Sequence, residues 1–524
     1  MLRISLYNIR KRKISFSAFQ THDLISIIAV FFFLISIAFA QAGDGRLLSD
    51  SWPIVDSFRE LELRGEIPIV RNVWPDRSGE VQAVLPDSFT GDAAQFWATE
   101  LRKQLIRTSI KHDTLRFFIE PGTYAILNNP RDPDDRFYPT LRLGGGMKKG
   151  MLEGFVTYVV NLRWANEENY RGRQWEGFAG RPDQVYIRTG GDDWGIKFGK
   201  DYLSWGEGLI LGRAHDPFER LDYELELGPF HFSGFTGFLD PYRFREPMAD
   251  STVVRWANRY LTGHRLEFVS KHVTIALHET VTYGGVGRSP EIIYFIPFYW
   301  YHAEQLNRGL DDNTMVGGDF QVLFAPVKLS FELLVDDIQV EAETQGDEEP
   351  DEIGIVGQMD YGATVFGKWL TLSARYEGVT NRTYNQNRPW NRYIFMDTYL
   401  GSSLGNDADR TALSAKCYLR PEAIIRVEGF YLREGEGSVF DAWEEPWMDV
   451  EGHYSEPFPT GIVQETTGFG FEWKGYYSKY GFWRVGFETG RVQNAAHVEN
   501  EEKNYWQLDL DLALSFYPEV SMKQ

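Results

Sequence analysis

Two stretches of the sequence, residues 164–183 and 378–407, combine aromatic and arginine side chains in a pattern that suits carbohydrate recognition. Aromatic rings offer flat faces on which sugars stack, and planar polar groups hydrogen-bond to hydroxyl groups. Arginine favours an acidic polysaccharide, because its guanidinium fork grips carboxylates. The candidate binding residues are Trp164, Arg171, Arg173, Trp175, Arg382, Tyr384, Arg388, Trp390, Arg392 and Tyr393. The alternative is that these are ordinary exposed loops, which are commonly polar and aromatic without binding a ligand.

Residues 341–352 and 434–463 are strongly acidic. Their carboxylates can bind divalent cations that bridge lipopolysaccharide, or they can stay hydrated. We expect them to be hydrated. The single cysteine, Cys417, excludes an intramolecular disulfide and any metal site built from several cysteines. We therefore expect no metal site and no cofactor.

Catalytic arrangements are poor in this sequence. His215 and Asp216 are adjacent, which on a strand sends the two side chains to opposite faces. His272 and His278 share a face, but six residues separate them by about 20 Å along a strand, so they cannot ligate one metal. A hydrolase site near the rim of the protein would have to use Ser204, His215, Asp216 and Glu219. We expect that the protein is not an enzyme.

The composition narrows the class of protein further. The 524 residues have a mean hydropathy of -0.36 and are 25% charged, which excludes a bundle of membrane helices. Lysine and arginine total 54 against 75 acidic residues, and the net charge of -21 argues against a nucleic-acid partner. Aromatic residues make up 15% of the chain, which is typical of a large β-protein or of a secreted aromatic-rich enzyme.

Residues 1–40 have the features of a secretory signal peptide. A basic run at 10–13 precedes an apolar run at 24–39, and Ala38-Phe39-Ala40 fits the small-x-small pattern before a cut at Gln41. The apolar run is short for a membrane-spanning helix, although an uncleaved anchor is the alternative. Cleavage removes five basic residues and one acidic residue, which leaves 49 against 74 and a net charge of -25.

Residues 41–113 are predicted to form a small helical region in the periplasm. Ile54, Phe58 and Leu61 recur at helical spacing, which predicts a helix over 51–63. Two further short helices are expected over 79–85 and 92–105. A region of this size is too small to be confidently independent, so we expect it to pack against the rest of the chain.

From Leu115 onward, apolar residues recur with a period of two. In residues 508–516, leucine or phenylalanine occupies every second position, with acidic or small residues between them. Residues 327–335 and 370–376 repeat this pattern. Because successive side chains of a strand point to opposite faces, each of these strands has one apolar and one polar face.

The connections between the predicted strands alternate between long and short. We place eighteen strands, which begin near residues 115, 140, 151, 184, 193, 222, 231, 259, 272, 315, 327, 353, 368, 408, 422, 464, 481 and 504. Nine long loops interleave with eight tight turns. This pattern is typical of a transmembrane barrel, with short periplasmic turns, long outer loops and an even number of strands, whereas a soluble sandwich has no reason to alternate so regularly.

Residues 114–524 are therefore predicted to form an antiparallel, all-β transmembrane barrel of about 18 strands in the outer membrane. The expected partners are outer-membrane lipid and lipopolysaccharide, the barrel-assembly machinery and an acidic surface polysaccharide. A barrel of this width can enclose a water-filled lumen, so a porin for small solutes is the alternative function.

Two features of the predicted barrel stand out. Glu279 shares the parity of Ile275 and Leu277 and would face lipid, which is costly for a bare carboxylate. We expect a bulge to turn it inward, with a position above the hydrocarbon zone as the alternative. The aromatic loop 284–314 is long and apolar, and one possible course for it is inward, as a constriction or plug.

Three segments carry a resemblance to a known family. Residues 197–211 contain a Trp-Gly-x-Gly turn whose third position is Glu207, where the family commonly has proline. Residues 260–266 lead to 279–285, and residues 313–319 read Asn-x-x-x-Gly-x-Asp. Together, in this order, they resemble the capsule-assembly Wzi family of outer-membrane barrels over much of residues 50–330. The motif residues are Trp205, Gly206, Glu207, Gly208, Arg265, Glu279, Asn313 and Asp319.

The resemblance implies a fold and a role. Members of this family are eighteen-stranded barrels with a small periplasmic helical part. They are implicated in holding or assembling surface polysaccharide.

Overall fold

The computed structural model describes most of the chain after residue 52. The described residues are 53–74, 85, 98–99, 101–102, 114–127, 136–161, 179–191, 193–213, 215–248, 251–296, 298–338, 349–420, 423–450, 454–477, 481–514, 516 and 518–521. They all belong to one compact unit, Gln41–Gln524. The predicted signal peptide, the predicted helix over 79–85 except Leu85, and most of the predicted helix over 92–105 lie outside the described residues.

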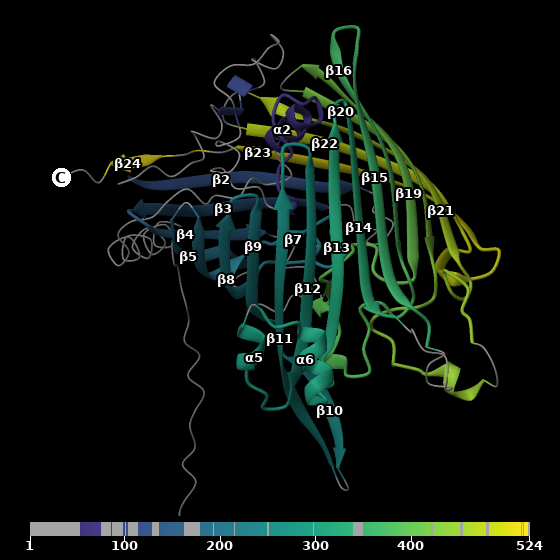
Figure 1. The fold of residues 1–524 in the computed structure, drawn as a ribbon. Coiled ribbons are helices and arrows are strands. Elements are labelled where there is room, and N and C mark those ends of the chain that lie inside the picture. The colour runs from purple at the N-terminus through teal and green to yellow at the C-terminus, as the bar shows by residue number, and fades with distance from the viewer. Residues whose placement is uncertain are drawn as a thin grey trace, which may run out of the picture. The chain divides into compact units, whose positions relative to one another are not determined.

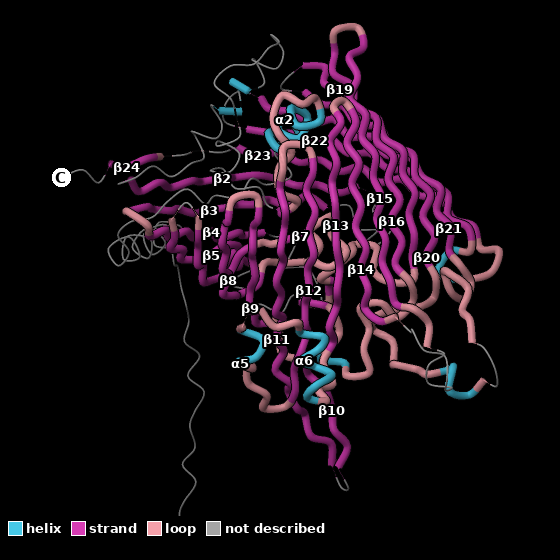
Figure 2. Tube along the Cα trace, viewed as in Figure 1, coloured by secondary structure: helices cyan, strands magenta, loops and turns pink. Residues whose placement is uncertain are grey.

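Eighteen antiparallel strands close into a barrel, in which each strand pairs with its neighbours along the chain (Figures 1 and 2). The first strand, β2, closes the barrel by pairing with the last, β23. The eighteen strands are β2 (Thr114–Leu127), β3 (Arg136–Lys149), β4 (Leu152–Asn161), β5 (Gly180–Gly190), β6 (Trp194–Asp201), β8 (Phe218–Leu227), β9 (Phe230–Phe238), β11 (Ser251–Val269), β12 (Val273–Gly285), β13 (Asn313–Phe324), β14 (Val327–Asp337), β15 (Glu352–Val365), β16 (Lys368–Val379), β19 (Ala408–Arg420), β20 (Ala423–Glu434), β21 (Gln464–Tyr477), β22 (Gly481–Gln493) and β23 (Glu502–Leu514). The predicted fold class and strand number are confirmed.

Two additional strands lie at the ends of barrel strands. β10 (Tyr242–Met248) pairs with the first half of β11 and extends it as a hairpin beyond the rim. β24 (Glu519–Ser521) pairs with the start of β2. β24 thereby continues the seam between β2 and β23, whereas β10 takes no part in closing the barrel.

The alternation of side chains explains how this polar chain can sit in a membrane. In β14, Leu329 and Leu333 point outward and are exposed, whereas Lys328, Ser330 and Glu332 point into the lumen and are buried. The same two-residue period runs through the neighbouring strands, because every ladder between β11 and β14 keeps its register. The outer wall is therefore apolar and the lumen is polar. None of the described helices is long and apolar enough to cross a membrane.

Helix α2 (Pro53–Leu63) lies at the end of the barrel that carries the short turns (Figure 1). Its Asp56 pairs with Lys416 and Lys474, and its Glu60 accepts a hydrogen bond from Thr371, all three of which are barrel residues. Glu62 pairs with Lys328 at 3.1 Å. The helix predicted over 51–63 thus forms, and its acidic side chains attach it to the inner wall.

The connection between β12 and β13 does not enter the lumen. Its helices α5 (Ile292–Phe295) and α6 (Tyr301–Arg308) lie against the outer side of β9, β11 and β12 (Figure 2). Tyr294 and Tyr301 pack there with Tyr260 and Tyr283, which share the parity of the outward-facing Leu266 and Leu277. The possible inward course of residues 284–314 as a plug is therefore wrong. The aromatic face of this loop is buried against the outside of the barrel wall.

Glu279 explains why this loop folds outward. The β11–β12 ladder is continuous through His264↔Glu279, so no bulge turns the carboxylate inward as we expected. Glu279 keeps its outward parity and accepts hydrogen bonds from the backbone N–H groups of Tyr301 (2.8 Å) and His302 (2.7 Å), in the first turn of α6. The helix thereby covers the carboxylate and supplies the donors that lipid cannot.

Replacing Glu279 with alanine is expected to loosen α6. The change removes the acceptor for two N–H groups in the first turn, which costs about 0.5–2 kcal/mol for a comparable cap. Trypsin should then cleave after Arg308 faster than in the parent protein. Glu279→Gln keeps an acceptor oxygen, so trypsin should cleave this variant at a rate close to that of the parent protein. Equal rates for Glu279→Ala and the parent would contradict this role.

Candidate functional site

The segment between β6 and β8 runs through the lumen. Its β7 (Ser204–Trp205) pairs with β1 (Val73–Trp74) of the N-terminal region. Gly206 and Gly208 have φ values of 60° and 101°, which L side chains adopt with strain, and a Cβ on Gly206 would lie 2.9 Å from the carboxylate of Glu332. The Trp-Gly-x-Gly turn therefore requires its glycines inside the barrel.

The barrel wall holds this turn with charged groups. Glu332 of β14 accepts hydrogen bonds from the N–H groups of Leu209 (3.1 Å) and Ile210 (3.2 Å). Glu207 pairs with Arg375 of β16 at 3.1 Å and accepts a hydrogen bond from Asn72 at 3.3 Å. The motif residue Glu207 thus links the wall to the N-terminal region across the lumen.

A second set of motif residues forms a fully buried ion cluster. Arg265 of β11 pairs with Asp319 of β13 through both guanidinium nitrogens, and with Glu267 at 3.1 Å. Glu267 also accepts hydrogen bonds from Arg71 (2.9 Å) and from the N–H of Asn72 (3.0 Å). All three members of the cluster have no exposed side-chain surface. These residues fix residues 71–74 to the wall, which is a scaffolding role.

Three members of this lumen scaffold were not among the residues that the sequence singled out. They are Glu267, His278 and Glu332, which are buried and point inward. The available signal was their parity, because each stands at an inward position of a barrel strand. A charged group at such a position must find a partner in the lumen.

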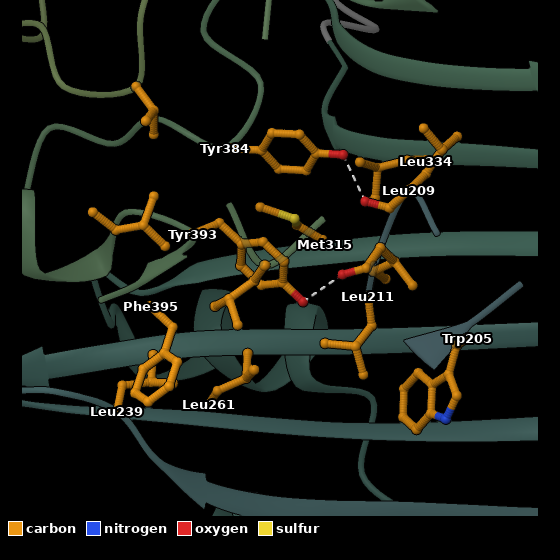
Figure 3. Close-up of a cluster of buried hydrophobic side chains, with 14 of the residues drawn as sticks. Trp205, Leu209, Leu211, Leu239, Leu261, Met315, Leu334, Tyr384, Tyr393 and Phe395 are labelled. Atoms are coloured by element: carbon orange, nitrogen blue, oxygen red, sulfur yellow. Dashed lines mark hydrogen bonds between the residues drawn. The ribbon is translucent and has the colours of Figure 1, made fainter. Parts of the chain in front are cut away.

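Residues 380–407 close the lumen at the end opposite α2. This loop contains η3 (Pro389–Asn391), β17 (Ile394–Phe395) and β18 (Thr398–Tyr399). Its apolar side chains pack on the segment that carries the Trp-Gly-x-Gly turn, around Leu209 and Leu211 (Figure 3). The lumen therefore contains an apolar core built from two loops and lined by inward residues of the wall.

Tyr384 and Tyr393 lie inside this core. Their hydroxyl groups donate to the carbonyl oxygens of Leu209 and Ile210, each at 2.6 Å, as Figure 3 shows. Neither residue has exposed surface. The prediction that these two rings stack on a sugar is corrected, because a fully covered ring offers no face to a ligand.

Arg382 and Arg392 attach neighbouring loops to one another. Arg382 pairs with Glu456 at 2.6 Å and lies 5.0 Å from the ring centre of Trp447. Arg392 is buried and donates to the carbonyl oxygens of Phe440 and Asp441. Both arginines use their donors to hold residues 434–463 against residues 380–407.

The electrostatics of the Arg382–Glu456 pair make this attachment sensitive to pH. Burial raises the pKa of Glu456, but hydrogen bonds from Arg382 and Tyr454 outweigh it and hold that pKa below its ordinary value of 4.5. Burial also lowers the pKa of Arg382, and Glu456 more than restores it. The pair is thus fully charged at neutral pH.

Acidification is expected to loosen the segment around Glu456, while Arg392 still holds Phe440 and Asp441. A folded pKa below 4.5 means that the pair contributes fully above pH 4.5 and is lost as the pH falls through the folded value. A fluorescent label on Ser455→Cys, next to Glu456 and exposed, in a Cys417→Ser background, should gain mobility in that acidic range. With Glu456→Gln added, the label should be mobile at every pH. A parent protein whose label mobility does not change on acidification would contradict the prediction.

Arg388 and Trp390 remain accessible at the rim. Arg388 pairs with Asp311 at 2.6 Å, with 52% and 57% of the two side chains exposed. Trp390 is half-buried, and its ring lies 5.6 Å from that of Phe244, which in turn stacks at 6.4 Å on Tyr242. We call Tyr242, Phe244, Arg388 and Trp390 the aromatic shelf.

The aromatic shelf joins two loops that are far apart in the sequence. Tyr242 and Phe244 alternate along β10 and so share one of its faces. This alternation is the sequence signal that could have identified them as part of the site. The motif residue Asn313 supports the shelf by donating to the carbonyl oxygen of Asn391 at 3.2 Å. The predicted binding residues Trp164, Arg171, Arg173 and Trp175 lie outside the described residues.

Two polar cavities of the lumen adjoin each other. One, of about 300 Å³, lies beside α2, and the other, of about 380 Å³, lies beneath Gly401 and Ser402 of the closing loop. Both are lined by Glu207 and Arg375, so the ion pair between these residues stands where the two cavities adjoin.

The residues of the hydrolase alternative do not assemble. The two ring nitrogens of His215 contact the carbonyl oxygens of Asp216 (2.8 Å) and Leu203 (3.2 Å). The Asp216 carboxylate pairs with Arg181 instead. Within the described residues, no group of three or more histidine, cysteine, aspartate or glutamate side chains is placed to hold a metal ion.

Comparisons with known proteins agree with this architecture. Among solved structures, the chain is similar to Wzi of Escherichia coli, an outer-membrane protein involved in group 1 capsule assembly and a carbohydrate-binding β-barrel. The two are 14% identical with a TM-score of 0.63, over 90% of this chain and 99% of that one. OpdK of Pseudomonas aeruginosa is weaker, at 11% identity and a TM-score of 0.46 over 77% of this chain and 99% of that one. No curated protein sequence matches with significance.

The match to a family model covers most of the barrel. The model is that of the capsule assembly protein Wzi, and it matches residues 148–505, which is more than half of the 524 residues. This range contains the Trp-Gly-x-Gly turn, the buried ion cluster around Arg265 and the closing loop 380–407. The chain therefore belongs to the capsule assembly protein Wzi family and is an outer-membrane β-barrel.

Proposed function

We propose that this barrel binds an acidic surface polysaccharide at its rim and so helps to assemble or anchor a capsule, without catalysing a reaction. The aromatic shelf carries the proposal. Its rings provide stacking faces, and Arg388 provides a guanidinium group whose present partner, Asp311, is itself exposed. Exposed ion pairs contribute about 0–1 kcal/mol, so a carboxylate of a ligand can compete for this arginine.

The filled lumen favours an anchor over a porin. Barrels of 16–18 strands leave an aqueous channel only where their interior is not occupied. Here the apolar core around Leu209 and Tyr384 occupies one end of the lumen, and α2 stands at the other. Lipopolysaccharide and the barrel-assembly machinery are the further partners that we propose for a barrel of this class.

Loss of the aromatic shelf is expected to weaken polysaccharide binding. Arg388→Ala removes a charge-assisted hydrogen bond of about 1.5 kcal/mol, or roughly a tenfold loss of affinity, and Trp390→Ala removes a stacking face. Binding of purified acidic capsular polysaccharide to the barrel in detergent micelles measures both effects. Cells that carry either variant should also shed polysaccharide while they grow normally.

The chain offers a matched control for the arginine. Arg491, near the end of β22, pairs with Glu502, at the start of β23, at 2.6 Å, with 55% of each side chain exposed. Arg491→Ala should leave the affinity unchanged, because Arg491 is not part of the aromatic shelf. Equal losses for Arg388→Ala and Arg491→Ala would mean a non-specific effect of charge and would count against the aromatic shelf.

A further inference from the structure

The apolar run 292–300 lies on the outside of the barrel with several large side chains uncovered. Within it, Ile292 is 81% exposed, Phe298 is 84% exposed and Trp300 is 62% exposed. Water-exposed loops seldom present so many large apolar groups together, and contiguous exposed apolar patches mark interaction surfaces. We therefore expect the apolar surface of this run to be covered by another molecule or by the membrane.

The run continues the lipid-facing wall of the barrel. The ring of Phe298 stacks on Phe232 at 5.7 Å. Phe232 pairs in the ladder with Leu266, which pairs in turn with Leu277, and both leucines are exposed on the outer wall. Phe298 therefore lies at the depth of residues that already face hydrocarbon.

The backbone of the run is compatible with a lipid environment. Hydrocarbon tolerates a peptide only where its N–H groups are satisfied within the protein. Three of its N–H groups, those of Tyr294, Ile296 and Tyr299, donate to the carbonyl oxygens of Glu291, Ile293 and Ile296, respectively. Those of Tyr301 and His302 donate to Glu279, so the start of α6 is satisfied as well.

The polar groups beneath the run are largely covered, with 18% of the His264 side chain and 5% of the Glu279 side chain exposed. His264 and Glu279 face outward from β11 and β12 and lie 3.4 Å apart. The ring of Tyr301 covers His264 with 4.5 Å between ring centres. A polar pair on a lipid-facing wall is costly unless something shields it, and residues 292–302 provide that shield.

We propose that residues 292–300 are embedded in the outer leaflet of the membrane and contact its acyl chains, while α6 leads from this depth back towards water. Tyr299 and Trp300, at the junction, suit the headgroup level, where tyrosine and tryptophan are enriched. This connection between β12 and β13 is thus a membrane anchor on the outside of the barrel, independent of polysaccharide binding.

Depth-resolved fluorescence quenching tests the proposal. Single cysteines replace Phe298, Leu277 or Asn307 in a Cys417→Ser background and carry the fluorophore bimane. Each variant is reconstituted into phosphatidylcholine vesicles with or without bromine on the acyl chains, and is also titrated with aqueous iodide. Heat-modifiable migration in gels confirms that each variant is folded.

The expected result is a gradient along the segment. Phe298→Cys should be quenched by brominated lipid to the same extent as the wall residue in Leu277→Cys, and Asn307→Cys, near the end of α6, should be quenched by iodide. Ile292→Cys provides a second position in the run should Phe298→Cys fail to fold.

Two outcomes would overturn the proposal. Quenching of Phe298→Cys by iodide but not by brominated lipid would place the run in water. Protection from both quenchers, together with cysteine cross-linking into dimers, would instead identify a second copy of this chain as the occupant.

Discussion

Deleting residues 381–406 and joining Thr380 to Asp407 by a short glycine-serine link is expected to convert the closed barrel into a conducting pore. The N–H of Asp407 already donates to the carbonyl oxygen of Thr380, so the two ends are adjacent and β16 and β19 keep their pairing. The deletion removes Tyr384 and Tyr393 from the apolar core, and it removes the cover of the cavity beneath Gly401.

Planar-bilayer recordings measure this effect. The parent barrel should show little steady conductance, because its lumen is filled at both ends. The deletion variant should show steady openings, since an unoccupied barrel of this width holds a water channel. Selectivity should be weak, because the exposed cavity walls carry both Glu207 and Arg375.

A deletion of similar length on the outer wall is the control. Removing residues 287–310 takes away α5 and α6 but keeps Asp311, which contacts the closing loop, so it should not raise conductance. Large steady conductance in the parent protein would support the porin alternative. A variant lacking 381–406 that folds and stays silent would mean that the segment around Leu209 closes the lumen alone.

Replacing Arg265 with leucine is expected to destabilise the barrel by about 3–5 kcal/mol, the cost of removing one partner from a buried ion pair. Asp319 would remain in the lumen wall without its arginine and Glu267 would keep only Arg71, and neither carboxylate has exposed side-chain surface. Unfolding by guanidinium in lipid vesicles, followed by tryptophan fluorescence, measures the loss.

Two further variants separate charge burial from loss of packing. Arg426 pairs with Glu428 on the same side of the wall but is 48% exposed, so Arg426→Leu should cost at most about 1 kcal/mol. Combining Arg265→Leu with Asp319→Asn and Glu267→Gln removes the stranded charges and should restore part of the stability. If Arg265→Leu and Arg426→Leu cost the same, the buried cluster does not have the role that we give it.

The aromatic loops show where sequence reasoning reaches its limit. Residues 284–314 and 378–407 are both long, and both are rich in tyrosine and tryptophan. One of them folds over the outside of the barrel and the other fills its end. Composition does not separate them, because their partners, Glu279 in one case and the carbonyl oxygens of Leu209 and Ile210 in the other, lie elsewhere in the sequence.

The burial of individual loop residues could not be predicted from the sequence either. Tyr384 and Trp390 stand six positions apart in one polar loop, yet the first is covered in the core and the second lies at the rim. The sequence pattern predicts a bulge that turns the Glu279 carboxylate inward, whereas the carboxylate faces outward. A strand pattern contains no information about a helix that covers the strand. Both depend on contacts between distant segments.

The sequence by itself determined the eighteen strands, their two faces and the alternation of turns and loops, because these follow from a two-residue period and from connection lengths, which are local. It also indicated the family through motif residues, most of which meet inside the barrel. Only the tertiary structure decided which loop closes the lumen, which rings stay accessible and which segment lies on the outer wall. Those outcomes depend on the closed barrel, which brings Arg265, Glu332 and Glu279 to partners far away in the chain.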